Sequence, residues 1–317
     1  IGDDQTICYN TLPSAFTDLV SPSGGNTLTY QWQYKAGAGA WTSISGATSL
    51  SYSVVSSLTQ TTMYRRAAIS GSGCGSAYSN EITITVYPNL TAGTIGTSQT
   101  ICYNTAPSGL TELAVATGGT GTFTYQWQSS PTGAAPWTDI SGATSATYAP
   151  GTLTTSTWYR RAVTSGSCGT VYSTGIKITV NPDLTPGAVG TAQSICYNTS
   201  PAGFTQLSSA AGGTGIYTYQ WQSSATGADP WSDISGATSG TYAPGALTAT
   251  TWYRRAVTSG SCGTVNSAGI KILVYNALSG GTIGDDQTIC YNTLPSAFTD
   301  MVSPSGGNTL TYQWQYK

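Results

Sequence analysis

The feature that most constrains this chain is an internal repeat of 94 residues. The strings TYQWQ and YRRA recur at this spacing to within a residue or two, and so do the cysteines. Self-similarity at a fixed period is the signature of an array of equivalent structural units. We therefore expect repeat 1 at 1–88, repeat 2 at 89–182, repeat 3 at 183–276 and the start of an incomplete repeat 4 at 277–317.

A longer period lies above the first. Residues 283–317 reproduce residues 1–35 letter for letter, except that Leu19 becomes Met301. Repeats 2 and 3 differ from repeat 1 at many positions, whereas repeat 4 begins as a near copy of it. The simplest account is a long array built from a three-repeat cassette, residues 1–282. Such an organisation fits stalks, fibres and adhesins better than enzymes.

Each repeat has the pattern of an all-β domain. Short segments rich in Thr, Tyr, Val, Ile and Trp are separated by clusters of Gly, Pro, Ser and Asn, which predicts strands and turns. No segment has a sustained helical apolar periodicity. About seven strands per repeat match an immunoglobulin-like β-sandwich, so the predicted fold class is all-β, with tandem immunoglobulin-like β-sandwich repeats forming an elongated rod. In repeat 2 the strands are expected near 96–102, 110–116, 123–129, 137–140, 147–149, 157–164 and 171–180.

Alternation along the strands predicts the core. Tyr125 and Trp127 share one face of their strand, and we expect this Trp to lie in the sandwich core together with Tyr148, Leu153 and Tyr159. Its equivalents in the other repeats are expected to do the same. The predicted core tryptophans are Trp32, Trp127, Trp221 and Trp314.

An Arg-Arg pair follows the same alternation, so one arginine of each pair must point inward. The inward residues are expected to be Arg66, Arg161 and Arg255. A buried guanidinium needs carbonyl or carboxylate partners, because an unpaired buried charge is costly. We prefer the interpretation in which it closes the open end of the sandwich. The alternative is an inter-domain or inter-filament contact.

The cysteines indicate disulfides and hence an oxidising compartment, since the chain has no CxxC motif and no histidine. The candidates are Cys8, Cys74, Cys102, Cys168, Cys196, Cys262 and Cys290. Pairing within a repeat, as in Cys8–Cys74, is the preferred prediction. If those two residues lie at opposite ends of one sandwich, a link between neighbouring repeats such as Cys8–Cys168 is better placed. The sequence leaves the connectivity open.

Composition argues against catalysis and against several classes of partner. Charged residues make up 7% of the chain, the net charge is −2 and histidine is absent. Without histidine no Ser-His-Asp or Cys-His arrangement can form, and the few carboxylates rarely keep their positions between repeats. We therefore predict no enzyme activity, no cofactor and no metal site. The charge balance predicts no nucleic-acid partner, and no apolar run is long enough for a membrane-spanning segment.

The combination of ICYN, YQWQ, ISGAT, YRR and a late Cys resembles the immunoglobulin-like repeats of giant secreted and surface adhesins of gliding Bacteroidota. The resemblance covers the whole chain. It implies an extracellular or cell-surface protein, exported by the type IX system of that phylum. We therefore expect the structural shaft of a surface adhesin or extracellular filament, with self-association in a fibre favoured by the low charge.

Two alternatives remain open: a polysaccharide-binding array and an accessory region of a secreted glycosidase. For the first, four tryptophans of repeats 2 and 3 are the candidate platforms on which sugar rings would stack: Trp137, Trp158, Trp231 and Trp252. Met63 stands where repeats 2 and 3 have Trp158 and Trp252, which weakens this reading.

Overall fold

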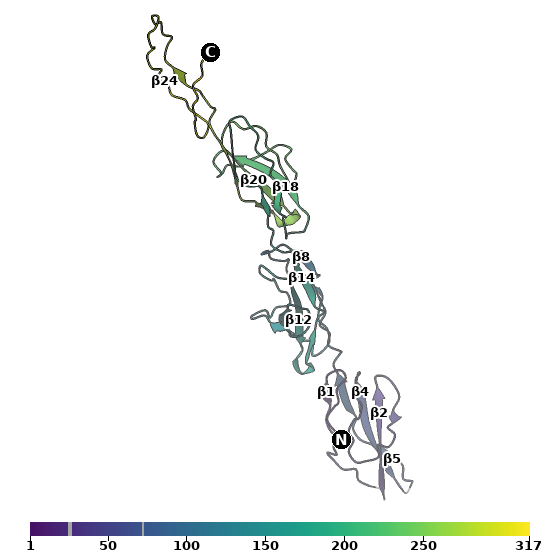
Figure 1. Ribbon diagram of the computed structural model, residues 1–317. Helices are drawn as coiled ribbons and strands as arrows, with labels where there is room; N and C mark the ends of the chain where they lie inside the picture. Colours follow the sequence, from purple (N-terminus) through teal and green to yellow (C-terminus); the bar gives the residue numbers. More distant parts are fainter. Residues whose placement is uncertain (25–26, 72) are drawn as a thin grey trace. The chain divides into compact units, whose positions relative to one another are not determined.

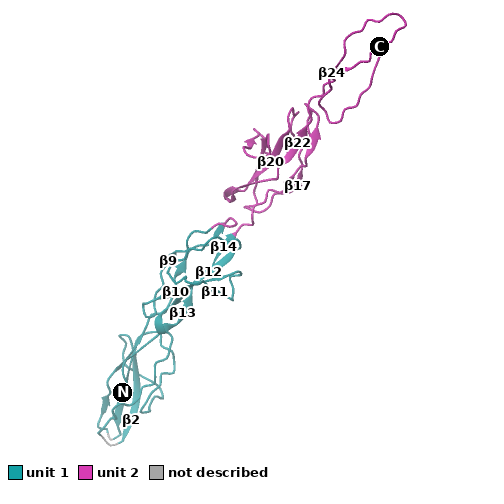
Figure 2. Ribbon diagram, turned by 90° about the vertical axis from the view of Figure 1, so that its left-hand side faces the viewer, with its two compact units in different colours: residues 1–100, 106–179 teal, residues 101–105, 180–317 magenta. Residues whose placement is uncertain are grey.

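The computed structural model describes residues 1–24, 27–71 and 73–317. Within these residues the secondary structure consists of strands and two single-turn 3-10 helices (Figure 1). The chain divides into two compact units (Figure 2). The first contains residues 1–100 and 106–179, and the second contains residues 101–105 and 180–317.

Repeat 1 is built on a six-stranded open sheet. The strand order is β1-β6-β4-β2-β3, and β5 pairs with β4 beside β6. Strands β1 and β6 are parallel, and the other pairs are antiparallel. The strands are β1 (Gln5–Ile7), β2 (Leu28–Ala36), β3 (Thr42–Ser43), β4 (Thr62–Ser70), β5 (Ser76–Tyr78) and β6 (Ile82–Val86).

Repeats 2 and 3 form the same sheet with the same order. In repeat 2 the strands are β8 (Gln99–Ile101), β10 (Thr124–Ser130), β11 (Thr138–Asp139), β12 (Thr157–Thr164), β13 (Thr170–Tyr172) and β14 (Ile176–Val180). In repeat 3 they are β16 (Gln193–Ile195), β18 (Thr218–Ser224), β19 (Ser232–Asp233), β20 (Thr251–Thr258), β21 (Thr264–Asn266) and β22 (Ile270–Val274).

The opposite layer of each sandwich is shorter. It consists of isolated bridges, such as Phe16 with Tyr52 and Leu110 with Tyr148, and of two-stranded sheets. Those sheets pair β7 (Thr94–Ile95) with β9 (Glu112–Ala114), β15 (Ala188–Val189) with β17 (Gln206–Ser208), and β23 (Thr282–Ile283) with β24 (Asp300–Val302). The tandem immunoglobulin-like sandwich fold predicted from the sequence is thus confirmed.

Two predicted strands of repeat 2 were wrong in their extent. The segment 147–149 is reduced to the isolated bridge of Tyr148 with Leu110. The segment 171–180 forms two strands, β13 and β14, rather than one. The interruption occurs at Ser173, whose hydroxyl oxygen accepts a hydrogen bond from the Arg161 backbone N–H at 2.9 Å. A side-chain oxygen therefore replaces a backbone carbonyl in the ladder at this point.

The core of each complete repeat surrounds its tryptophan. Trp32, Trp127 and Trp221 have no exposed surface, and each indole N–H donates to a backbone carbonyl at 2.9 Å. Tyr64 and Tyr253 pack nearby, and burial raises the pKa of each phenol to about 12.

The core position of the fourth tryptophan stays a prediction. Trp314 belongs to the start of repeat 4 and is 62% exposed in residues 283–317.

Candidate functional site: the repeat junctions

Two disulfides join neighbouring repeats. Cys8 of repeat 1 is bonded to Cys168 of repeat 2, and Cys102 of repeat 2 to Cys262 of repeat 3, each across 160 residues. The bonded Cα atoms are 5.2 and 5.3 Å apart, within the usual range. The preferred pairing within each repeat was therefore wrong, and the alternative between repeats is the one found.

Sheet topology explains why Cys8 does not pair within its own repeat. Cys8 follows β1, which runs parallel to β6 and therefore ends where β6 ends. Cys74 follows β4, which runs antiparallel to β6 and ends where β6 begins. The two cysteines thus lie at opposite ends of one sheet. Cys74 is exposed. Cys8, Cys102, Cys196 and Cys290 all stand in the repeated ICYNT motif and are called the Cys8 set; of these, Cys196 and Cys290 are exposed.

Each cysteine of the Cys8 set begins the same turn, and this turn explains why the motif ICYNT recurs. The asparagine two residues later has a positive φ of 56 to 64°, a conformation that asparagine tolerates better than most residues. The threonine after it donates its hydroxyl hydrogen to the cysteine carbonyl at 2.6–2.7 Å. In the three complete repeats this turn directly follows the strand β1, β8 or β16 and fixes the cysteine there.

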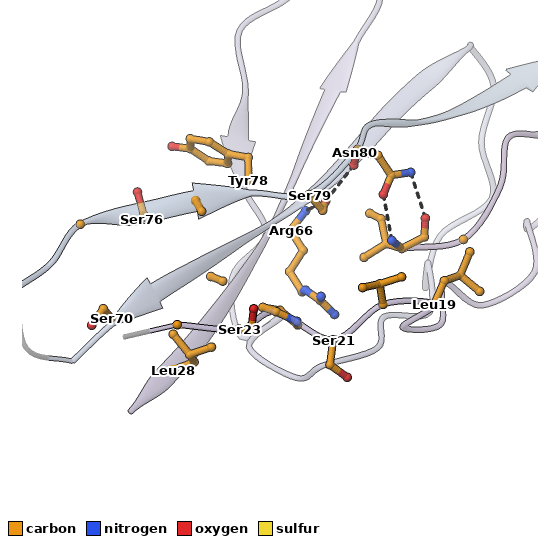
Figure 3. Close-up of a pocket in the computed structure, with 18 of the residues that line it drawn as sticks. Leu19, Ser21, Ser23, Leu28, Arg66, Ser70, Ser76, Tyr78, Ser79 and Asn80 are labelled. Atoms are coloured by element: carbon orange, nitrogen blue, oxygen red, sulfur yellow. Dashed lines mark hydrogen bonds between the residues drawn. The ribbon is translucent and has the colours of Figure 1, made fainter. Parts of the chain in front are cut away.

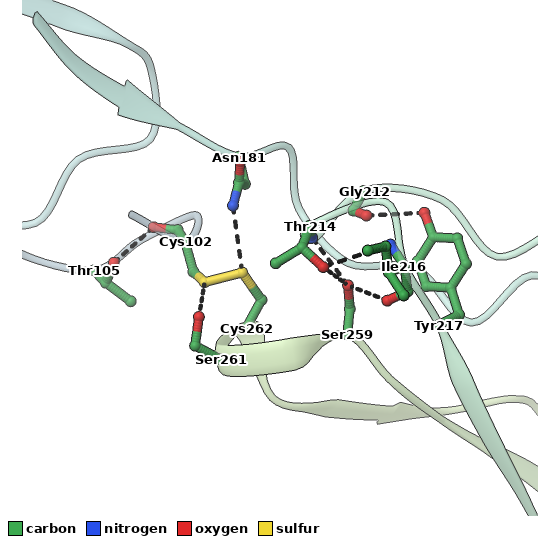
Figure 4. Close-up of a disulfide and its surroundings, with 10 residues drawn as sticks. All are labelled: Cys102, Thr105, Asn181, Gly212, Thr214, Ile216, Tyr217, Ser259, Ser261 and Cys262. Carbon is green, nitrogen blue, oxygen red and sulfur yellow. Dashed lines mark hydrogen bonds between the residues drawn. A yellow bond between two sulfur atoms is a disulfide. The ribbon is translucent and has the colours of Figure 1, made fainter. Parts of the chain in front are cut away.

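The partner cysteines Cys168 and Cys262 end the short 3-10 helices η1 (Gly166–Cys168) and η2 (Gly260–Cys262). At the second disulfide, the Ser261 hydroxyl lies 3.9 Å from the Cys102 sulfur, and the Asn181 amide donates to the Cys262 sulfur at 3.7 Å (Figure 4). Ser259 directly precedes η2 and is buried. Its hydroxyl oxygen accepts a hydrogen bond from the Thr214 N–H at 2.9 Å, which fixes the start of this helix.

The linker after each complete repeat (residues 87–93, 181–187 and 275–281) pairs with the edge of the next repeat through an isolated bridge, and the two-residue strands β7, β15 and β23 follow it directly. In repeat 2, Thr91 and Thr117 exchange backbone hydrogen bonds of 2.9 and 3.2 Å, and the Gly119 N–H donates to the Pro88 carbonyl at 2.9 Å. Leu90 is 8% exposed and Leu184, its equivalent in repeat 3, is 7% exposed. The linker is therefore packed along the edge of the repeat that follows it.

The inward arginines hold this linker in place. Arg161 and Arg255 have no exposed surface, and their Nη2 groups donate to linker carbonyls, those of Ala92 at 3.0 Å and Pro186 at 2.8 Å. Arg66, which is 3% exposed, instead pairs with Asp18 at 2.7 Å. Burial lowers the pKa of the Arg255 guanidinium.

The interpretation of these arginines as inter-domain contacts needs correction. Within the described residues, every hydrogen bond found for the three inward guanidinium groups ends in the same repeat. The partners are carbonyl and carboxylate or amide oxygens. Arg161 and Arg255 are completely buried and leave no guanidinium surface for a neighbouring filament, and Arg66 is 3% exposed.

The outward arginine of each pair lies on aromatic rings. The Arg160 guanidinium carbon is 4.4 Å from the centre of the Trp137 ring and 4.0 Å from that of Tyr172. Arg65 and Arg254 stack on Trp41 and Trp231 in the same way, at 4.2 and 4.4 Å. The candidate sugar platforms Trp137 and Trp231 are half-buried and each already contacts its own arginine.

Other sites were looked for in the part of the chain that the structure describes. There, no three Cys, Asp or Glu side chains lie close enough together to hold a metal ion. No helix in these residues combines the length and the hydrophobicity that crossing a membrane requires.

Comparison with known proteins gives one family. The sequence model of a family described as a domain of unknown function (DUF8696) matches residues 1–88, 91–182 and 185–276. No curated protein matches the chain in sequence.

Among solved structures, the similar ones include three arrays of several consecutive domains. Extracellular domains 3–5 of Drosophila OTK share 14% identity, with a TM-score of 0.34, over 86% of this chain and 94% of that one. Three N-terminal domains of the bacteriophage RB49 outer capsid protein Hoc share 13%, with a TM-score of 0.35, over 86% and 96%. Immunoglobulin domains 1–4 of Sidekick-1 share 13%, with a TM-score of 0.29, over 90% and 75%.

Proposed function

The chain belongs to the DUF8696 family through three consecutive repeats, and we propose that it is the structural shaft of an extracellular bacterial surface adhesin or filament. The disulfides support the extracellular location, because such bonds persist in oxidising environments. The resemblance to repeats of giant adhesins of gliding Bacteroidota supports the bacterial surface. A shaft has no need of catalysis, in keeping with a chain that lacks histidine.

The overlap of the two disulfides is the observation that carries the proposal. The loop closed by Cys8 and Cys168 contains Cys102, and the loop closed by Cys102 and Cys262 contains Cys168. A pull on the two ends of the chain therefore meets a short covalent route. It runs from Cys8 to Cys168, back along 66 residues to Cys102, and across to Cys262. The oxidised chain therefore cannot lengthen between Cys8 and Cys262 beyond this short route, even if repeats unfold.

Single-molecule force measurement tests this function. Fully extended, 66 residues span about 220–240 Å, whereas the 254 residues from Cys8 to Cys262 span about 840–910 Å. We expect the oxidised chain to extend by the shorter length between these residues, and the reduced chain by the longer one. A Cys8→Ser/Cys102→Ser variant serves as the matched control and should behave as reduced under all conditions.

Equal extension of the oxidised and reduced chains would remove the basis for a shaft whose length is limited by disulfides. The alternative, polysaccharide binding, has its own readout on a glycan array. Binding that is abolished by Trp137→Ala and kept by Met63→Ala would favour the alternative. We do not favour it, because the Trp137 ring is half-buried against Arg160.

Self-association of shafts in a fibre is part of the proposal. With charged residues at 7% of the chain, few like charges oppose lateral contact. Exposed strand edges are a further means of pairing between chains.

A further inference from the structure

The outer face of each six-stranded sheet, the face turned away from the core, carries charged residues that differ between repeats. In repeat 1 this face is marked by Arg65 and by Tyr78, whose ring centre lies 3.8 Å from the Arg65 guanidinium carbon. Figure 3 shows Tyr78 and the inward Arg66 on opposite sides of the sheet. Residues that pair in register on neighbouring strands point to the same face, so the charges can be followed from one edge to the other.

In repeat 1 one row of paired residues runs across the sheet from a basic side to an acidic side. Lys35 in β2 pairs with Met63 in β4, and Met63 pairs with Thr83 in β6. Asp4 directly precedes β1, and its carboxylate accepts a hydrogen bond from the Thr83 N–H at 2.7 Å. The row therefore begins with a lysine beside β3 and ends with an aspartate at the β1 edge.

The neighbouring row of repeat 1 has the same polarity. Glu81 directly precedes β6, and the register of β4 with β6, continued by one residue, places it opposite Arg65. At the equivalent position of repeat 2, a Cβ on Gly175 would lie 3.1 Å from the Trp137 ring, which stacks on the outward Arg160. This position therefore faces the outer side, and the β6–β1 side of repeat 1 is acidic while its β2 side is basic.

Repeats 2 and 3 have the opposite polarity at the same positions. Asp139 in β11 stands where β3 of repeat 1 has a serine, so this edge is acidic. Lys177 in β14 replaces Thr83, so the other side is basic. The buried Ser130 replaces Lys35, and uncharged residues replace the two acidic ones of repeat 1. Repeat 3 has the same residue types as repeat 2: Asp233, Lys271 and Ser224.

These charges have no charged partner nearby in their own chain. In the part of the chain that the structure describes, the ion pairs found involve two inward arginines, Arg66 and Arg161, and no residue of the outer face. The position of Asp4 is exposed in every complete repeat, since its counterparts Ser98 and Ala192 are exposed as well. The lysines and aspartates of the two edges are therefore available to a partner of opposite charge.

We propose that a second copy of this chain docks edge to edge on these sheets, with repeat 1 against repeat 1 and repeats 2 and 3 against repeats of their own kind. The β1 side of one repeat meets the β3 side of the other, so that Asp4 faces Lys35 and Lys177 faces Asp139. Each lysine lies one strand in from its edge, and its side chain can span that strand because neighbouring strands are about 4.8 Å apart. This inference rests on the self-association in the proposed function and assigns the surface for it.

The reversed polarity makes this docking selective. If repeat 1 met repeat 2 in the same way, Asp4 would face Asp139 and Lys177 would face Lys35, and like charges would oppose each other. Pairing of two like edges gives opposite charges only between repeat 1 and repeat 2 or 3. A cassette has two repeats of the second kind for one of the first, so such pairing leaves a repeat facing its own charge. Contacts between unlike surfaces also propagate into open assemblies, as a fibre requires.

Zero-length cross-linking tests the arrangement on the full chain. A carbodiimide joins a lysine amine to a carboxylate in contact with it, and an equal mixture of isotope-labelled and unlabelled chains identifies links between copies. We expect mixed-label links between Lys35 and Asp4. Mixed-label links between Lys35 and Asp139 would overturn the pairing of equal repeats, and an associating chain without mixed-label links would overturn the docking surface. Within repeats 2 and 3 the expected links join either lysine to either aspartate: Lys177 or Lys271 with Asp139 or Asp233.

Charge reversal with rescue tests the same contact in solution. Lys35→Glu should weaken self-association about fivefold at low ionic strength, measured by sedimentation equilibrium, because its carboxylate faces Asp4 of the second copy. Adding Asp4→Lys should restore association, since the pair is then reversed rather than broken. The fold tolerates this change, because repeat 3 has Ala192 at the position. Unchanged association of Lys35→Glu, or no recovery in the double variant, would contradict the contact.

A matched double variant separates the contact from net charge. Lys35→Glu combined with Asp183→Lys has the same net charge as the rescued variant, but Asp183 is exposed in a linker and lies off the outer face. It should associate as weakly as Lys35→Glu alone, and full recovery would assign the effect to net charge. None of these variants changes a cysteine, so the force measurement is independent. A chain that stays monomeric at every concentration would also remove self-association from the proposed function, whereas association that ignores these charges would remove only this surface.

Discussion

Repeats 2 and 3 place an arginine at the same point of the same sheet but give it partners of different charge. The Arg161 Nη1 donates to the Glu112 carboxylate at 2.7 Å, and the Arg255 Nη1 to the Gln206 amide oxygen at 3.1 Å. Both arginines keep a linker carbonyl and a second carbonyl, that of Ala146 or Gly240. The constant partners are the carbonyls. The arginine therefore serves chiefly to bind the linker, and the carboxylate is an optional addition.

Removing the arginine should have the largest effect on the stability of a repeat, and it tests whether repeats 2 and 3 depend on it in the same way. We expect Arg161→Ala to destabilise repeat 2 by about 3–5 kcal/mol, because it leaves buried carbonyls and a carboxylate without their donor. Arg255→Ala should cost about 1 kcal/mol less, since only neutral partners lose a hydrogen bond. Hydrogen exchange of the β12 and β20 amides measures each repeat separately. A larger loss in repeat 3 than in repeat 2 would contradict the assignment of roles.

Exchanging the residues that accept from the arginine Nη1 should have a smaller effect on stability, and it measures what the carboxylate adds to the carbonyl partners. Glu112→Gln is expected to lower the stability of repeat 2 by less than about 1 kcal/mol, since the carboxylate is partly exposed and the carbonyl partners remain. Gln206→Glu is the reciprocal change and should stabilise repeat 3 by a similar amount at low ionic strength. If Glu112→Gln cost as much as Arg161→Ala, the carboxylate and not the linker carbonyl would be the essential partner.

The smallest expected effect is that of pH on stability, which should differ between repeat 1 and repeat 3. A hydrogen bond from the Ser21 hydroxyl, together with Arg66, lowers the pKa of Asp18 below its usual value. The carboxylate stabilises the folded state fully above the unfolded pKa of about 4, and this contribution is lost as the pH falls through the lower folded value. Repeat 3 has Gln206 at this position and should not show the loss.

Hydrogen exchange near Arg66 between pH 7 and pH 2 checks this prediction. Asp18→Asn should remove the dependence in repeat 1 while leaving repeat 3 unchanged. An identical acid response in the wild-type chain and in this variant would assign the effect to other groups.

Local pattern was enough to predict the sandwich and the inward arginines. Period-two alternation decides which face Trp127 and Arg161 occupy, and it depends only on neighbouring residues. The disulfide pairing depends on which strands are adjacent and in which direction they run, and alternation does not contain that information. Cys8 is separated from Cys74 only because β1 is parallel to β6.

The pairing of each linker with the next repeat was not predicted from the sequence, for a related reason. Residues such as Pro182 and Gly187 are typical of turns, and the intrinsic preference of the segment is not that of a strand. It pairs with the next repeat because that repeat supplies hydrogen bonds and a guanidinium at fixed positions. In this protein the edge of a repeat is specified by its neighbour in the chain as well as by its own residues.

The overlapping cystine loops also change what a broken peptide bond does to the molecule. A cut between Cys8 and Cys102 leaves the fragments joined through Cys168, and a cut between Cys168 and Cys262 leaves them joined through Cys102. A cut between Cys102 and Cys168 is bridged by both bonds. A single cut by a protease anywhere from Cys8 to Cys262 therefore does not break the covalent connection, and the parts of the chain on either side of the cut stay attached.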